Sequence, residues 1–113
     1  MCGKYSWRKM EAFQSREQDL GTLAEESEVR VAFPLKDSIG FPKIARLESS
    51  CSCTDPMMDV EHRQLVAIYD TGRVPPHLRQ RGYKESTKYI RVVYEDGSEE
   101  ILSFSAKVKA KGI

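Results

Sequence analysis

The segment near the C-terminus constrains the fold of this chain more than any other feature. Apolar residues occupy every second position from Leu102 to Val108, and polar residues fill the positions between them. A period of two is the signature of a β-strand with one buried face. A second apolar segment, residues 88–94, precedes it, and Asp96-Gly97 between the two is a typical hairpin turn. The sequence therefore predicts a β-hairpin with one buried face.

Earlier segments carry weaker strand patterns. In residues 29–35 large apolar side chains alternate with Arg30, Ala32 and Pro34, and Pro34 restricts this strand to an edge or to its own end. Residues 42–49 form a second predicted strand after a turn at residues 36–40. Residues 64–70 are apolar on both faces, which is typical of a central strand. Short strands separated by turns, with no helical run between them, favour a two-layer β-sandwich.

Chain length limits this sandwich to one domain. The 113 residues supply a single modest core, and the 31% share of charged residues predicts a densely charged surface. We therefore expect an all-β protein, an immunoglobulin-like antiparallel β-sandwich over residues 19–113. Residues 73–82 form a polar loop in which Pro75-Pro76 disfavours both helix and sheet.

Residues 1–18 differ from the rest and are predicted to form an N-terminal arm. Trp7, Met10 and Phe13 are spaced three apart, which places them on one flank of a short helix over residues 6–18 with Ser6 as its cap. Two interpretations follow: these side chains cover an open face of the sandwich, or they face outward and bind another subunit.

The order of several short motifs resembles a known family. Asp19-Leu20-Gly21-Thr22-Leu23 is followed by the strand at 29–35, by Ser49-Ser50-Cys51-Ser52-Cys53-Thr54, by Tyr69-Asp70-Thr71 and by the final hairpin. This order resembles the bacterial immunoglobulin-like family called domain of unknown function 1573, which is similar to major-sperm-protein and Hydin-type domains. Ser52 stands where that family usually has glycine. The resemblance implies an immunoglobulin-like fold, in a family whose members are mostly secreted or envelope proteins or modules of larger chains.

Charge and hydropathy exclude several function classes. Eighteen Lys and Arg against seventeen Asp and Glu give a formal net charge of +1, so no global field attracts nucleic acid or an anionic membrane. No apolar run is long enough to cross a bilayer, and the first thirty residues contain no signal-peptide core. We therefore expect a cytoplasmic protein, or a virion protein if it is viral, that does not contact membranes.

Three cysteines are an odd number, and reduced thiols are the simpler expectation. Cys51 and Cys53 are weak candidates for a soft metal, because a complete site would need Cys2, His62, His77 or Asp55 at no recognisable zinc spacing. An extended strand would also point the two sulfurs to opposite faces. We expect no metal and no cofactor. A thiol-based metal-binding or redox protein remains the alternative.

No catalytic constellation is visible in the sequence. His62 and His77 have no nucleophile or orienting carboxylate at a recognisable spacing, and the seven glycines form no phosphate-binding loop. The sequence therefore predicts that this protein is not an enzyme, with no catalytic residues.

Positive charge gathers in the polar loop between residues 73 and 84. The candidate partner-binding residues there are Arg73, Pro75, Pro76, His77, Arg79 and Arg81. Nucleic-acid surfaces usually combine such charge with several exposed aromatic residues, which this loop lacks. Other protein subunits are the expected partners, bound through this loop and the arm.

These observations favour a non-enzymatic structural or interaction module. A subunit of a larger assembly, such as a capsid or tail component of a phage virion, fits a small chain with a polar arm. A cytoplasmic or envelope adaptor domain is the alternative that the same features allow.

Overall fold

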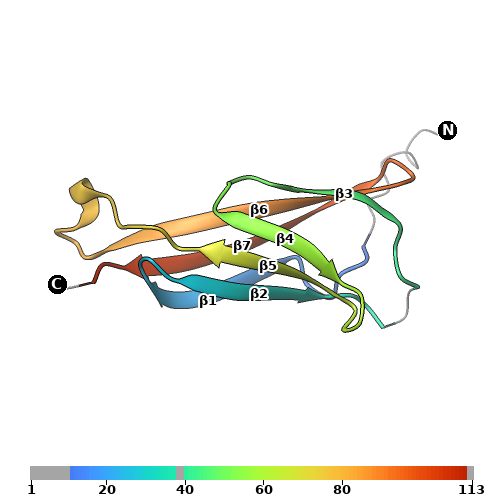
Figure 1. Ribbon diagram of the computed structural model, residues 1–113, viewed down its shortest axis with the longest axis horizontal. Helices are drawn as coiled ribbons and strands as arrows, with labels where there is room; N and C mark the ends of the chain where they lie inside the picture. Colours follow the sequence, from blue (N-terminus) through green and yellow to red (C-terminus); the bar gives the residue numbers. More distant parts are fainter. Residues whose placement is uncertain (1–10, 38–39, 112–113) are drawn as a thin grey trace.

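The computed structural model describes residues 11–37 and 40–111, and it is an all-β sandwich (Figure 1). Its strands, in chain order, are β1 (Glu17–Ala24), β2 (Glu28–Pro34), β3 (Ile44–Ser49), β4 (Thr54–Asp59), β5 (Gln64–Asp70), β6 (Tyr83–Tyr94) and β7 (Glu99–Lys109). A four-stranded sheet has the order β1-β7-β6-β3, and a three-stranded sheet has the order β2-β5-β4. The predicted all-β sandwich is confirmed.

Strand direction differs from the prediction at one pair. β1 runs parallel to β7, whereas the other paired strands are antiparallel. The four-stranded sheet is therefore mixed, and the prediction of a purely antiparallel sandwich is wrong for this pair. The segment before β1 lies beside the end of β2, where Phe13 pairs with Leu35, and β1 itself then pairs with β7 in the other sheet.

The core lies between the two sheets and contains the predicted inward residues. Leu102, Phe104, Ala106 and Val108 are all buried, and they alternate with more exposed positions along β7. Tyr69 of β5 meets Phe104 edge to face, with 5.1 Å between ring centroids. This aromatic contact joins the two sheets at the centre of the core.

Four predicted strands are confirmed with changes at their ends. β2 is an edge strand that ends at Pro34, and β5 is the central strand of its sheet. β3 begins at Ile44, two residues after the predicted start. β6 begins at Tyr83, well before residue 88, so the final hairpin is longer than its apolar pattern indicates.

Two predictions about local structure are wrong. Residues 11–16 contain no helix, and Glu17 already belongs to β1; the rest of the predicted helix lies outside the described residues. The loop after β5 contains a one-turn 3₁₀ helix, Pro76–Leu78. Proline at the first helical position is compatible with a helix start, because its fixed φ suits the turn and no N–H is lost from the ladder.

Candidate functional site

A shallow groove follows the outer face of β7 in the four-stranded sheet, and we call it the outer groove. It consists of four adjoining hollows, the largest of about 580 Å³. Neighbouring hollows share side chains from β1, β7 and β6. The shared residues are Glu17, Tyr89 and Ser103, then Asp19, Thr87 and Ser105, then Thr22 and Lys107. The hollows therefore form one continuous surface.

Strand register explains the shape of the outer groove. Ser103 of β7 lies between Tyr89 of β6 and Glu17 of β1, and Ser105 lies between Thr87 and Asp19 in the next row. Because side chains in each row point to the same face, two small serines form a floor between longer neighbours. The groove forms because the side chains of Ser103 and Ser105 on β7 are shorter than those of the neighbouring strands β1 and β6.

The two ends of the outer groove differ in chemistry. At one end Tyr89 and Ile101 are about half exposed, beside the carboxylate of Glu17. At the other end Arg81 and Lys107 each lie 4.4 Å from the centre of the Tyr83 ring. Hydroxyls, carboxylates and cations thus line one surface and can hydrogen bond to an extended chain.

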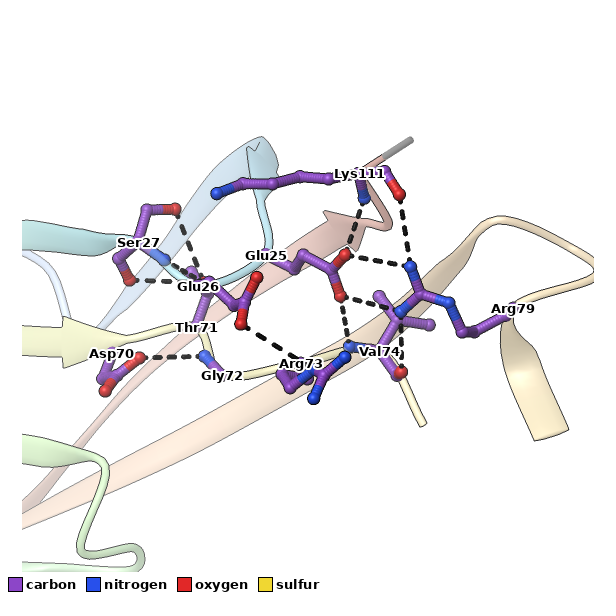
Figure 2. A network of polar contacts seen from close by, with 10 residues as sticks. All are labelled: Glu25, Glu26, Ser27, Asp70, Thr71, Gly72, Arg73, Val74, Arg79 and Lys111. Carbon is purple, nitrogen blue, oxygen red and sulfur yellow. Dashed lines mark hydrogen bonds and ion pairs between the residues drawn. The ribbon is translucent and has the colours of Figure 1, made fainter. Parts of the chain in front are cut away.

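Arg79, a predicted partner-binding residue, forms hydrogen bonds within its own chain. Its guanidinium makes a two-pronged contact with Glu25, at 3.1 and 3.2 Å, and also donates to the carbonyls of Val74 and Lys111 (Figure 2). The carboxylate of Glu25 is buried and accepts hydrogen bonds from the backbone N–H groups of Val74 and Lys111 as well. This network ties together the β1–β2 turn, the loop after β5 and the end of the chain.

The same network sets the acidity of Glu25. The hydrogen bond from Arg79, followed by those from the two backbone N–H groups, lowers the pKa of Glu25 from 4.5 to about 2. The carboxylate is therefore charged throughout the range in which proteins usually work. It has a structural role, because its oxygens are occupied by donors from its own chain.

A second buried carboxylate, Glu100, performs the same task at the opposite end of the sheet. It accepts hydrogen bonds from the backbone N–H of Ala12, from Arg16 Nε and from the hydroxyl of Tyr94. Burial, with the neighbouring Glu100 carboxylate, raises the pKa of Tyr94. Glu100 was not predicted as a functional residue, although it occupies an inward position of the β7 alternation, two residues before Leu102.

The other predicted loop residues remain on the surface. Arg73 is exposed and forms an ion pair with Glu26 at 3.7 Å. Pro76 and His77 lie exposed in the 3₁₀ helix, which Pro75 precedes. Arg81 is the one predicted loop residue that lines the outer groove.

Of the three predicted arm residues, Phe13 can be placed. It is buried in the main core and pairs with Leu35 through an isolated β-bridge. The structure thus favours the interpretation that Phe13 covers the sandwich, and it is not available to another subunit. Trp7 and Met10 lie outside the described residues.

The expectation of reduced thiols at Cys51 and Cys53 is wrong, because a disulfide joins them. The two cysteines lie in a turn between β3 and β4 and not in an extended strand, so their sulfurs face each other. Over residues 11–37 and 40–111, no group of three His, Cys, Asp or Glu side chains is placed to hold a metal. His62, a proposed ligand, instead contacts Asp59 at 2.8 Å, and this hydrogen bond lowers the pKa of Asp59.

Comparison with known proteins gives a fold but no family. No family model and no curated protein matches the chain. A structure of an SrpA adhesin variant from Streptococcus sanguinis is similar, with a TM-score of 0.53 and 14% identity over 80% of this chain and 55% of the adhesin chain. A second SrpA adhesin structure gives a TM-score of 0.52 and 13% identity over 80% and 53% of the two chains.

A 2,6-sialyltransferase from Photobacterium sp. JT-ISH-224 is a weaker match, with a TM-score of 0.40 and 18% identity over 86% of this chain and 18% of the enzyme. This similarity is too low to carry an argument. The protein spans about half the length of the adhesin chains. At such low identities the SrpA similarity establishes the sandwich fold and nothing finer.

Proposed function

We propose that this protein is a non-enzymatic interaction module that binds a segment of a partner protein in the outer groove. The observation that carries the proposal is the continuity of the groove over three strands. Its serine and threonine hydroxyls offer donors and acceptors along the whole length, while its ends supply charge and aromatic surface. The fold is shared with parts of an adhesin, which supports a module of the interaction class.

The chemistry of the described residues supports binding more than catalysis. The two buried carboxylates, Glu25 and Glu100, are fully engaged by donors from their own chain. Hydroxyls in the groove, such as Ser103 and Ser105, have no histidine beside them to act as a base. A rigid sheet with small polar side chains is suited to recognition.

Site-specific photo-crosslinking tests the proposed function. Tyr89 in the outer groove and Met57 on the outer face of the other sheet are about equally exposed, at 49% and 52%. A photoreactive amino acid replaces each in turn, and the protein is irradiated in lysate of its native host. We expect one defined protein to crosslink from position 89 and not from position 57. Equal crosslinking from both faces would contradict the proposal.

A finer proposal is that the module is a subunit of a larger assembly, such as a virion capsid or tail, rather than a cytoplasmic or envelope adaptor. It rests on the sequence interpretation alone. Light scattering of the native particle measures its mass. A particle mass equal to many copies of the chain supports an assembly subunit, and the mass of a free monomer contradicts it.

The described residues contain no helix long and apolar enough to cross a membrane.

A second candidate function is thiol-based redox or metal chemistry at Cys51 and Cys53, favoured by the disulfide between them. Thiol counting before and after reduction, with metal analysis of protein purified without added metal, tests it. A redox role requires that reduction changes partner binding. Unchanged binding, together with the absence of bound metal after reduction, would remove this candidate and leave the disulfide as a link within the turn.

A further inference from the structure

The end of the outer groove near the C-terminus of β7 holds an unusual charge cluster. A hollow of about 490 Å³ is lined by the cations Arg81, Lys107 and Lys109, with Tyr83 and Thr22 between them. We call it the basic pocket. All three cations are exposed, and the strand register places Lys109 opposite Tyr83. Two cations thus share one aromatic ring, and a third lies beside it.

These cations have no carboxylate partner in the part of the chain that the structure describes. Other arginines do form ion pairs: Arg16, Arg30, Arg46, Arg73, Arg79 and Arg91. The guanidinium of Arg81 instead donates to the carbonyl of Tyr83, which fixes its position. Three like charges without an ion-pair partner repel one another, and Glu85 opposite Lys107 offsets only part of this repulsion, so an anion bound here would relieve it.

We propose that the basic pocket binds the acidic end of an extended partner segment that lies along the outer groove. This inference rests on the proposed function and names the chemistry of the partner. The planar guanidinium of Arg81 suits a carboxylate, and Lys107 and Lys109 add charge from the strand. The occupant is therefore a protein segment with carboxylates at one end.

The rest of the groove excludes a uniformly anionic chain. Glu85 lies directly opposite Lys107 in the strand register, and farther along the groove the lining includes Asp19 and then Glu17. A phosphodiester backbone running along β7 would meet these carboxylates in turn, and like charges at close range repel. A peptide can instead place acidic residues over Lys107 and basic residues over Glu17. This charge order favours a protein partner over nucleic acid.

Strand geometry sets the spacing of the partner's charges. Ser103, beside Glu17, and Lys107 are four residues apart on β7. At the rise of an extended strand this separation is about 13 Å. An extended partner segment therefore needs its acidic and basic side chains roughly four to six residues apart.

A peptide titration followed by NMR tests the inference on the full-length protein. The probe is an extended peptide of about nine residues with glutamates at one end, threonine and valine in the middle and lysines at the other end, made in both chain directions. A peptide of the same composition with its charges alternated is the control. We expect saturable shifts at Tyr83, Lys107 and Ser103 with one direction of the probe, and at least about tenfold weaker binding of the control.

Variants of the protein with reversed charges in the basic pocket provide a second test with the same peptide. The double variant K107E/K109E should weaken probe binding at least about tenfold, and exchanging the probe's glutamates for lysines should restore it. R81E serves as a second variant if the double variant folds poorly. K43E is the matched control, because Lys43 is exposed in the loop before β3 and outside the groove. It should bind the probe as the native chain does.

Three results would overturn the inference: equal binding of probe and control peptide, no effect of the charge reversals, or tighter binding of a short oligothymidylate to the same residues. The proposed function has a separate outcome. A partner that crosslinks from position 89 but is insensitive to K107E/K109E leaves the interaction module standing and removes the acidic segment. No crosslink from the groove removes both.

Discussion

Glu25 shows how one side chain can hold three segments together. Its oxygens accept donors from the loop after β5 and from the end of the chain (Figure 2), which are far apart in sequence. The guanidinium of Arg79 is held by this buried carboxylate and so has a structural role within its own chain. From the sequence alone Arg79 is expected at the surface, because it lies in a polar loop and its partner Glu25 is 54 positions away.

The stability of the protein should depend on the ionisation of Glu25. Its pKa falls from 4.5 to about 2 on folding, so the unfolded chain binds the proton more tightly between these values. The free energy of unfolding contributed by Glu25 is therefore complete above about pH 4.5 and is lost as the pH falls toward 2. Urea denaturation across this range should show a smaller acid loss for E25Q than for the native chain.

The matched control is E26Q, one residue away. Glu26 is half exposed, and its side chain forms an ion pair with Arg73 on the surface. E26Q should keep the acid dependence of the native chain, while E25Q should lower the melting temperature at neutral pH by roughly 5 to 10 °C. An acid loss of equal size in E25Q and the native chain would contradict the assigned role of Glu25.

Substitution of Tyr69 should have the opposite effect on the free energy of unfolding. Its hydroxyl is buried and has no hydrogen-bond partner among residues 11–37 and 40–111, while its ring packs on Phe104. Removing an unpaired buried hydroxyl relieves its desolvation cost, so Y69F should match or exceed the native free energy of unfolding by up to about 1 kcal/mol. Y94F is the control: it loses the bond to Glu100 and should be less stable. Chemical denaturation showing that Y69F costs as much as Y94F would refute this.

At the scale of elements, the sequence predicts strands whose pattern is uninterrupted. β7 and β2 alternate cleanly, and both were predicted. β1 was not predicted as a strand, because a bulge between Asp19 and Thr22, with Gly21 at a φ of 74°, separates Leu20 and Leu23 by three positions. Both leucines still pack inward. The extra residue at the bulge thus interrupts the alternation of apolar and polar side chains by which a strand is predicted from sequence.

β4 was missed for a different reason. Pro56 lies in its middle, and proline usually argues against a strand. β4 is at the edge of its sheet, where a missing N–H is tolerated. The outer groove could not be predicted either, since it depends on the register of β1 and β6 against β7 and not on any one segment. Arg81 alone among the predicted loop residues belongs to it.

Glu100 should determine whether the segment before β1 stays attached to the sheet. E100A leaves the Ala12 N–H and the Tyr94 hydroxyl without their acceptor. It also removes one of the two carboxylate partners of Arg16, the other being Glu11. We expect a loss of about 3 kcal/mol in the free energy of unfolding and faster hydrogen exchange at residues 12–16. E99A, on the exposed face beside it, should lose far less. Equal losses for both variants would show that Glu100 does not anchor this segment.

At the scale of the whole molecule, the two sheets present different faces. The inner faces form the core, and the outer face of the four-stranded sheet carries the groove along nearly the full length of β7. Figure 1 shows the β6–β7 turn and the C-terminal end of β7 at opposite ends of this sheet. Glu100 is the second residue of β7 after that turn, and Glu25 accepts a hydrogen bond from Lys111 just past the end of β7, so the two buried carboxylates hold opposite ends of the sheet. A surface supported in this way stays rigid, and rigidity lowers the entropic cost of binding.

The measurement that tests this account most directly is the affinity of the crosslinked partner for a protein whose groove is blocked. S105W places a large ring on the groove floor, and I68W places one on the half-buried outer face of β5 as a matched control. Both variants should fold, as judged by circular dichroism. The account predicts at least about tenfold weaker binding for S105W and native affinity for I68W. Native affinity for S105W, or equal losses for both variants, would contradict it.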